Sequence, residues 1–221
     1  MVAVRRLVSE LIGSALLAMI VIGSGIMAQQ LSPNDIGLQL LENALVTGCG
    51  LFVLIELFGP IGGAEFNPVV SLVKVALEGR SLVDALSYIP VQVAGCVVGA
   101  ITANAMFALP AVTWSQHHRV SGPHFLSEVI ATAGLVLTIF VLARRGRAAL
   151  IGVAVASYIT AAYFFTSSTS FANPAITVGR MFSNSFAGIA PDSVLFFIGA
   201  QLVGGLLGLG LITLLTTKEP S

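Results

Sequence analysis

Two short motifs carry the side chains best suited to bind a small polar molecule. They are Asn67-Pro68-Val69 and Asn173-Pro174-Ala175. An Asn placed before a Pro is a signal for the start of a helix, because Pro is favoured at the first helical position. A helix start presents free backbone N–H groups and about half a positive charge, and the Asn amide adds further donors. Two such starts that face one cavity are expected to hydrogen bond neutral polar molecules and to repel cations and protons.

The composition of the chain places both motifs in a membrane. Of the 221 residues, 56% are hydrophobic and only 9% are charged, whereas about a quarter of the residues in a soluble domain are charged. Ten acidic and ten basic residues cancel, so no basic patch suggests a nucleic-acid partner. Each Asn-Pro is followed by only about eight to ten apolar residues, which are too few to cross a bilayer.

Six apolar runs are long enough to span a bilayer. We expect the second run to stop at Gly59-Pro60 and the third to stop before Pro110. The first run lacks a small-residue cleavage site, so we expect it to remain as a helix. The sequence therefore predicts an all-α membrane protein with six transmembrane helices and two re-entrant half-helices. The six runs are residues 7–27, 39–58, 84–107, 124–143, 147–165 and 193–216.

The two halves of the chain repeat each other. Three features recur at similar offsets, because 128 − 10 is 118, 173 − 67 is 106 and 201 − 92 is 109. Each half contains three spans, so the second half must enter the membrane in the opposite orientation. This indicates an inverted 3+3 repeat within one domain of residues 1–221, with repeats of about 1–110 and 120–217. The matching pairs are Glu10 with Glu128, Asn67 with Asn173, and Gln92 with Gln201.

The basic residues predict the orientation of the chain. Only Arg119 and Arg180 fall on the outer side if both termini are cytoplasmic. This bias follows the positive-inside rule, so we expect cytoplasmic N- and C-termini. Short loops and termini favour a prokaryotic inner membrane. The eight basic residues on the cytoplasmic side are Arg5, Arg6, Lys74, Arg80, Arg144, Arg145, Arg147 and Lys218.

The doubled Asn-Pro motif, the paired glutamates and the six spans resemble the major intrinsic protein family, the aquaporins and aquaglyceroporins. The resemblance covers essentially the whole chain. It implies a right-handed helical bundle with one pore in each protomer, a homotetramer and no cofactor or metal. Asn67-Pro68-Val69 matches the first family signature and Asn173-Pro174-Ala175 the second. Val69 replaces the usual Ala, a change that keeps the amide donors.

The resemblance also places the extracellular constriction, where this chain departs from the family. Most members carry Arg three residues after the second signature Asn, and here Ile176 stands in that place. We expect Arg180 to face the extracellular end or the lipid headgroups rather than the pore. Without the Arg fork, the constriction is expected to be wider and less polar than a water-specific filter. The implied ring is Thr47, Ser170, Ile176 and either Ala161 or, with a shorter intervening loop, Tyr163.

These residues predict a passive channel for water and small uncharged solutes in the lipid bilayer. Candidate solutes are glycerol-like polyols, urea and neutral metalloid species such as arsenous acid. Thr177 stands where glycerol facilitators carry Asp, which weakens a reading as a dedicated glycerol channel. The alternatives are a strictly water-selective channel, which a Tyr163 ring would favour, and an alternating-access transporter. No nucleophile–base pair or metal cluster suggests an enzyme.

The remaining acids within the spans and loops, and the two cysteines, are interpreted one by one. The family resemblance suggests that Glu10 and Glu128 brace the loops before the Asn-Pro motifs, which agrees with the need of an intramembrane carboxylate for partners. Glu65 either faces the cytoplasmic mouth of the pore or caps the loop. Glu56 has no matching acid in the second half and no assigned role. Cys49 and Cys96 lie within apolar runs and are expected to pack in the core.

Overall fold

The computed structural model describes residues 2–216, and helices are the only regular secondary structure in that part of the chain. Six helices are long and apolar enough to cross a membrane, the fifth counted from Ala148 to Phe165. The expected all-α architecture is therefore confirmed. Lys218 and the end of the second repeat lie outside the described residues. The elements are α1 (Val2–Leu31), α2 (Ile36–Gly62), α3 (Pro68–Glu78), α4 (Leu82–Met106), α5 (Gly122–Arg144), η1 (Ala148–Leu150), α6 (Ile151–Phe165), α7 (Pro174–Arg180) and α8 (Pro191–Leu215).

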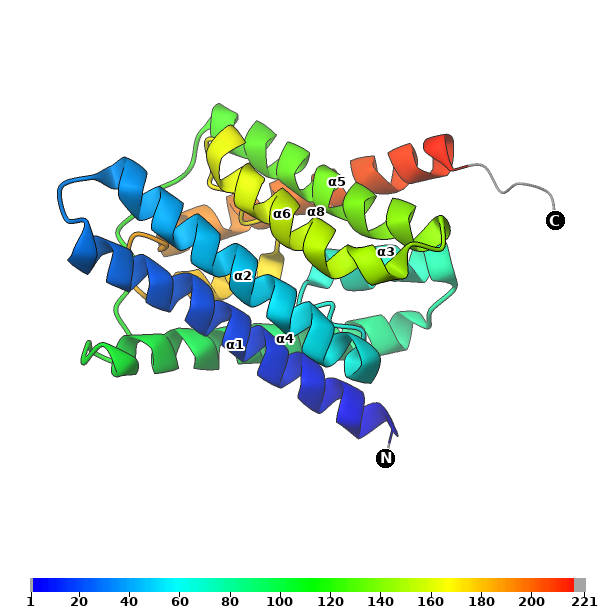
Figure 1. The fold of residues 1–221 in the computed structure, drawn as a ribbon, viewed down its shortest axis with the longest axis horizontal. Helices are drawn as coiled ribbons and strands as arrows, with labels where there is room; N and C mark the ends of the chain where they lie inside the picture. Colours follow the sequence, from blue (N-terminus) through cyan, green and yellow to red (C-terminus); the bar gives the residue numbers. More distant parts are fainter. Residues whose placement is uncertain (1, 217–221) are drawn as a thin grey trace.

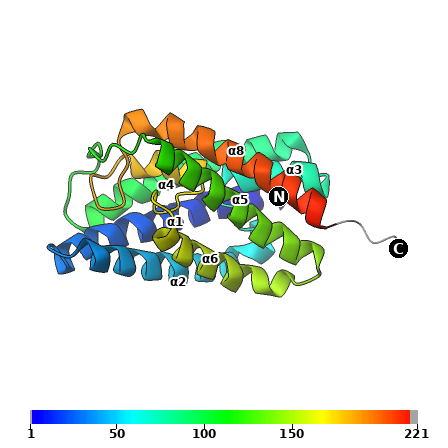
Figure 2. The same cartoon turned by 90° about the horizontal axis from the view of Figure 1, so that it is seen from above.

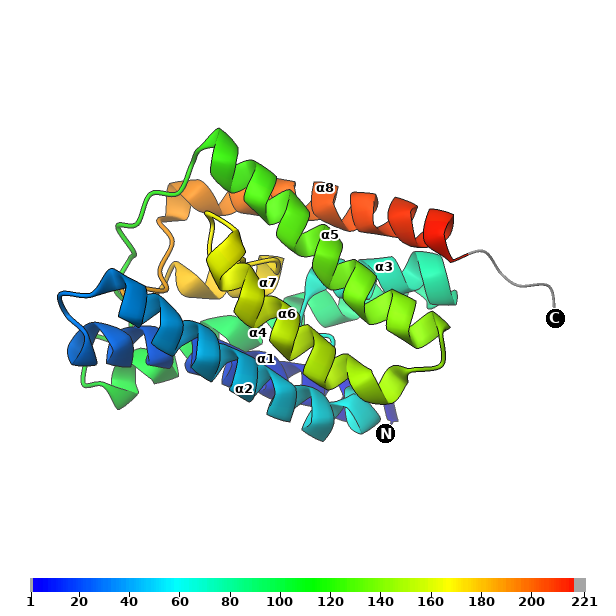
Figure 3. The same cartoon turned by 45° about the horizontal axis from the view of Figure 1, so that its top comes forward.

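The six long helices surround the two short ones. Figure 1 shows the long helices running roughly along one direction, with the start of α1 and the end of α8 at the same end of the bundle. The view from above shows α8 along one side, α2 and α6 along the other, and α5 crossing between them (Figure 2). In Figure 3 the short helices α3 and α7 lie end to end between the long ones. The bundle therefore holds both half-helices at its centre.

The helix contacts follow the repeat of the sequence. Helix α1 packs closely on α4, and its counterpart α5 packs on α8. Glycines make this approach possible: a Cβ on Gly95 would lie 2.5 Å from the carbonyl oxygen of Leu11, and one on Gly204 would lie 2.6 Å from that of Val129. Small residues at a helix crossing allow the two backbones to approach in this way.

Two local expectations were wrong. Helix α2 does not stop at Gly59-Pro60 but continues to Gly62 and ends at Gly63, whose φ of 96° lies in the left-handed region that favours Gly. The Pro in the last turn lacks a backbone N–H and therefore removes one helical hydrogen bond. The helix tolerates this loss because it ends within the same turn. Cys49 is exposed on α2 and does not pack in the core, whereas Cys96 is buried; both thiols are free. An apolar run in a membrane also has a lipid-facing side, where a thiol is tolerated.

Candidate functional site

Each half-helix begins at its Asn-Pro pair. The side-chain oxygen of Asn67 accepts a hydrogen bond from the backbone N–H of Val69, at 3.0 Å. Asn173 does the same for Ala175 and Ile176, at 2.9 and 3.3 Å. Pro68 and Pro174 take the first helical positions, as the sequence suggested. Each Asn therefore caps its helix with its oxygen and leaves its amide nitrogen for other partners.

The two Asn amides tie the half-helices together. The Asn67 amide donates to the carbonyl oxygen of Ala172 at 2.8 Å, and the Asn173 amide donates to that of Phe66 at 2.7 Å. Each amide has two hydrogens, and this bond uses one of them. Both Asn side chains line the central cavity of the bundle. The N-termini of α3 and α7 thus face one space near the middle of the molecule.

Two buried glutamates hold the loops that precede the half-helices. Glu10 accepts from the backbone N–H groups of Glu65 and Phe66, at 2.9 and 2.8 Å. Glu128 accepts from those of Phe171 and Ala172, both at 2.9 Å. These loops contain left-handed residues, Phe66 with φ 48° and Ala172 with φ 49° among them. Such conformations cost about 1–3 kcal/mol each, so the carboxylates hold the backbone where it is strained.

One glutamine completes each brace. Gln92 donates to Glu10 at 2.9 Å and to the hydroxyl of Ser71 at 3.1 Å. Gln201 donates to Glu128 at 2.7 Å and to the hydroxyl of Thr177 at 2.9 Å. Thr177 in turn donates to the carbonyl oxygen of Asn173, and the single hydrogen of the Ser71 hydroxyl is shared between the carbonyl oxygen of Asn67 and the carboxylate of Glu65. The sequence repeat contained Gln92 and Gln201, but their role appears only in the structure.

Val69 fits the first signature because a glycine faces it. The Val69 side chain is 2% exposed and lies with Val70, Val136 and Phe140 in one apolar cluster. A Cβ on Gly205 of α8 would lie 2.6 Å from Cγ1 of Val69. The absence of a side chain at position 205 therefore leaves room for the larger Val in place of Ala.

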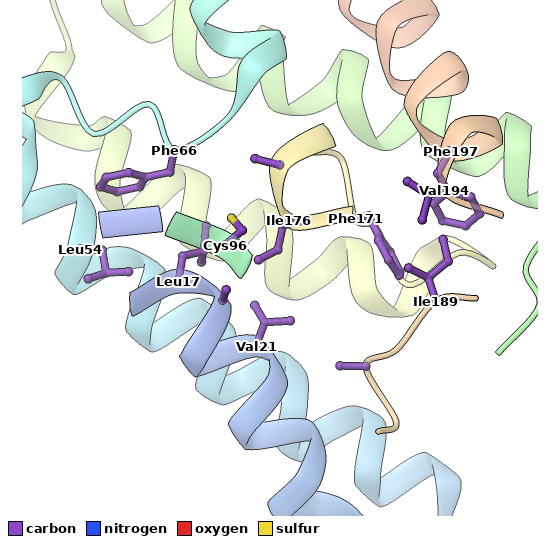
Figure 4. Close-up of a cluster of buried hydrophobic side chains, with 13 residues drawn as sticks. Leu17, Val21, Leu54, Phe66, Cys96, Phe171, Ile176, Ile189, Val194 and Phe197 are labelled. Atoms are coloured by element: carbon purple, nitrogen blue, oxygen red, sulfur yellow. The ribbon is translucent and has the colours of Figure 1, made fainter. Parts of the chain in front are cut away.

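A cavity of about 220 Å³ runs past both Asn residues. Most of its lining residues are apolar, and Figure 4 shows Ile176 of α7 in the same buried cluster as Leu17 and Val21 of α1. Polar groups lie at both ends and at the centre. The lining residues with polar side chains are Thr47, Glu65, Asn67, Lys74, Glu78, Tyr163, Ser170, Asn173 and Arg180.

Charged side chains gather at the end of the cavity near α3. Glu65 lines the cavity there and pairs with Lys74, at 3.1 Å, and with Arg80. It also accepts from the Ser71 hydroxyl at 2.5 Å. Glu65 therefore lines the cavity and ties the loop to α3 as well, so the two interpretations of this residue do not exclude each other.

Four of the five candidate filter residues lie at the opposite end of the cavity. Thr47, Tyr163, Ser170 and Ile176 line it, and the hydroxyl oxygens of Thr47 and Tyr163 are 3.3 Å apart. Ala161 is exposed on the outer surface of α6 and is absent from the lining. Tyr163 thus takes the position on α6 that the sequence left open between these two residues.

The expectation for Arg180 was wrong. Its side chain is only 2% exposed, lines the cavity and lies with its guanidinium carbon 3.3 Å from the centre of the Phe171 ring. It does not extend toward headgroups. A signal was present in the sequence: Ile176 and Arg180 are four residues apart in one helix, and residues at this spacing share a face.

No group of three or more residues suited to hold a metal ion is found within residues 2–216. Glu56 lies at the contact of α2 with Gly152, where its Oε1 occupies the space that a side chain at position 152 would take. Unlike the buried Glu10, Glu65 and Glu128, Glu56 is exposed.

Comparisons with known proteins agree with this architecture. The family model of the major intrinsic proteins matches residues 1–170. Aquaglyceroporin AqpS of Rhizobium meliloti (strain 1021) is 45% identical over 212 residues, which cover 94% of this chain and 88% of that protein. Aquaporin-4 of Bos taurus is 28% identical, over 74% of this chain and 54% of that protein.

A solved structure shows the same fold. The aquaglyceroporin from Plasmodium falciparum superposes with a TM-score of 0.71 at 18% identity, covering 95% of both chains. The family model spans well over half of the chain, and the fold agrees over nearly all of it. The chain belongs to the major intrinsic protein family.

Proposed function

We propose that the protein is a passive transmembrane channel for water and small uncharged solutes. The observation that carries this proposal is the cavity that passes the N-termini of both half-helices and the side chains of Asn67 and Asn173. Two helix N-termini place positive potential at the centre, which repels cations, while the free amide hydrogens offer bonds to a neutral solute.

The proposed solutes are larger than water. Ile176 stands where most members of the family carry Arg, and the hydroxyls of Thr47 and Ser170 supply small polar groups beside it. An aliphatic side chain there provides no donors and suits solutes with both apolar and hydroxyl groups. The solute classes are glycerol-like polyols, urea and neutral metalloid hydroxides such as arsenous acid. The name of the relative AqpS, an aquaglyceroporin, supports this choice.

A strictly water-selective channel is the second candidate. The contact of Tyr163 with Thr47 at 3.3 Å and the buried Arg180 favour it, because both place bulk or charge at the outer end of the cavity. The two candidates share the fold and the half-helices and differ only in the width of the opening.

Stopped-flow light scattering on proteoliposomes tests both candidates. We expect wild-type vesicles to take up glycerol, urea or arsenous acid faster than empty vesicles. Ile176→Arg should abolish the solute flux, because a guanidinium narrows the opening. Ile176→Leu is the matched control, which keeps an aliphatic group and should keep the flux. Fast water flux without entry of any solute would favour the water-selective channel. Neither water nor solute flux above that of empty vesicles would contradict both.

We further propose how the channel sits in its membrane. The positive-inside bias supports cytoplasmic termini, and the match to a bacterial relative supports a bacterial inner membrane. The family resemblance supports a homotetramer with one pore in each protomer, to be checked by the mass of the purified particle. It also supports one channel domain without enzymatic activity.

A further inference from the structure

The position of Arg180 in α7 directs its side chain back toward the filter. Arg180 follows Ile176 by four residues, so both lie on one face of the half-helix, and both line the cavity. Helical side chains tilt toward the N-terminus of their helix. The long Arg side chain therefore covers the turn that holds Ile176, a distance of about 5.4 Å along the axis.

The surroundings of Arg180 fix the guanidinium but leave donors free. Its Nε donates to the carbonyl oxygen of Ala187, and its guanidinium carbon lies over the ring of Phe171. Phe171 is itself held by an edge-to-face contact with Phe197, with ring centroids 4.9 Å apart. Within residues 2–216 the two Nη atoms of Arg180 have no hydrogen-bond partner, although the side chain lines the cavity. These nitrogens are thus available to a solute.

A second arginine adds charge at the same end. Arg119, in the loop before α5, donates to the carbonyl oxygens of Gly188, Ser168 and Phe186, and its guanidinium carbon lies 5.3 Å from the Phe171 ring. Each of its three nitrogens donates one hydrogen bond to a loop, and Arg119 is not among the residues that line the cavity. Arg119 therefore positions the loops and supplies charge. In the part of the chain that the structure describes, neither arginine forms an ion pair with a carboxylate.

Ser170 gives an independent sign that a ligand belongs here. Its side chain is 3% exposed and lines the cavity, and its hydroxyl oxygen has no hydrogen-bond partner among the described residues. A buried hydroxyl without a partner is costly unless a water or solute satisfies it. Ser170 therefore offers a hydroxyl beside the free donors of Arg180.

We propose that Arg180 serves as the filter arginine of this channel, reaching the outer constriction from one helical turn beyond the place where the family carries it. Arg180 and Ser170 bind the oxygen atoms of a passing neutral hydroxylated solute, and the charge of Arg180, reinforced by Arg119, repels cations. This inference rests on the proposed channel function and names the group that selects at its outer end. Ile176 alone would suggest a constriction without arginine, but Arg180 supplies one from the next turn of the helix.

Chemical restoration of the charge tests the proposal. Arg180→Cys is made in a Cys49→Ser background, since Cys49 is exposed and Cys96 is buried. Proton leak is followed with a pH-sensitive dye in proteoliposomes under a potassium diffusion potential. We expect Arg180→Cys to leak protons roughly tenfold faster than its background, because a unit charge in a low-dielectric passage dominates cation entry. Reaction with 2-aminoethyl methanethiosulfonate, which attaches an ammonium group, should restore the barrier.

Two controls separate charge from bulk and from folding. Methyl methanethiosulfonate attaches a neutral group to the same thiol and should leave the leak high. Arg145→Cys, on the exposed cytoplasmic loop, should show no leak with either reagent. Arg180→Lys keeps the charge without the planar fork, so it should keep the leak low while slowing the flux of a hydroxylated solute.

The outcomes are distinguishable from failure of the proposed function. An unchanged leak in Arg180→Cys, equal restoration by the neutral reagent, or a leak in Arg180→Lys as high as in Arg180→Cys would each overturn the role of Arg180. Wild-type vesicles that pass neither water nor solute would instead overturn the channel function. In that case the charge-dependent leak of Arg180→Cys still shows whether this residue closes the outer end to cations.

Discussion

Glu128 shows how much one buried carboxylate organises in this molecule. It is fully buried and accepts four hydrogen bonds, from the backbone N–H groups of Phe171 and Ala172, the hydroxyl of Ser168 and the amide of Gln201. An ionised carboxylate can accept this many hydrogen bonds because each of its two oxygens offers two lone pairs. Each of these donors would otherwise face a membrane interior without water.

Glu128→Gln is expected to destabilise the protein. The Gln amide replaces one acceptor oxygen by a donor, so at least one N–H of the loop or of Gln201 loses its partner. Each buried donor left unpaired costs about 1–3 kcal/mol, which corresponds to a fall in Tm of about 2–12 °C for a chain of this size. A thiol-reactive dye measures unfolding in detergent, since Cys96 is buried and becomes reactive only when the bundle opens; Cys49→Ser removes the exposed thiol.

Glu56→Gln is the matched control for this change. Glu56 is an exposed acid late in α2 and takes no part in holding either Asn-Pro loop. The same exchange there should leave Tm within about 2 °C of the wild type, because exposed substitutions rarely exceed about 0.5 kcal/mol. Equal losses in the two variants would contradict the bracing role of Glu128.

His117 reports on the charges of Arg119 and Arg180 at one end of the cavity. Partial burial, together with the positive charges of Arg119 and Arg180, lowers the pKa of His117 below its ordinary value of 6.5. The folded protein therefore binds this proton more weakly than the unfolded chain. The resulting contribution to stability is present above pH 6.5 and is lost as the pH falls through the folded pKa.

NMR titration of histidine-labelled protein checks this prediction. We expect the ring signal of His117 to titrate below pH 6.5 and, in Arg180→Gln, at a higher pH than in the wild type. Arg145→Gln, on the exposed loop that follows α5, should not move the titration. A midpoint above 6.5 in the wild type, or no change in Arg180→Gln, would mean that these charges lie too far from the ring to act on it.

At the scale of the elements, glycines determine how closely helices approach. Gly204 of α8 faces the backbone of α5, where a Cβ would lie 2.6 Å from the carbonyl oxygen of Val129. Gly210, on the same helix, has nothing within 4 Å of such a Cβ. The two residues have equal intrinsic cost in a helix and differ only in their neighbours.

Opposite effects are therefore expected from the same substitution at these two positions. Gly204→Ala should lower Tm, because two helix backbones must separate, and overpacking of a tight contact costs about 1–3 kcal/mol. Gly210→Ala should leave Tm unchanged or raise it slightly, since Ala is favoured over Gly in a helix by up to about 1 kcal/mol. The buried Cys96 serves again as the reporter. A Tm for Gly204→Ala equal to that of Gly210→Ala would contradict the close packing of α5 on α8.

The elements themselves could be predicted from the sequence because each has a local signal. Length and hydropathy indicate the six spans, and Asn-Pro marks both half-helix starts. The side-chain partners could not be read in this way. The stacking of Arg180 on Phe171 and the bond between Thr47 and Tyr163 join residues of different elements. The choice between Ala161 and Tyr163 depended on the length of a loop, which no pattern in the sequence determines.

At the scale of the whole molecule, the inverted repeat links the two ends of the pore to the two sides of the membrane. The cluster of Glu65, Lys74 and Arg80 lies at one end of the cavity, and Arg180 lies at the other. The start of α1 and the end of α8 lie at the same end of the bundle (Figure 1). Once one end of the bundle is assigned to a side of the membrane, the sides of the termini, the loops and both mouths of the channel follow.

Accessibility of single cysteines tests this orientation. In a Cys49→Ser background, Gln116→Cys places a thiol in the exposed loop before α5, and Arg145→Cys places one in the exposed loop after it. The positive-inside rule puts Arg145 on the cytoplasmic side, so a membrane-impermeant maleimide applied to intact cells or right-side-out vesicles should label Gln116→Cys alone. Permeabilisation should then expose Arg145→Cys as well. The reverse pattern would place Arg180 and Tyr163 at the cytoplasmic mouth, and the selective end of the pore would face the cell interior.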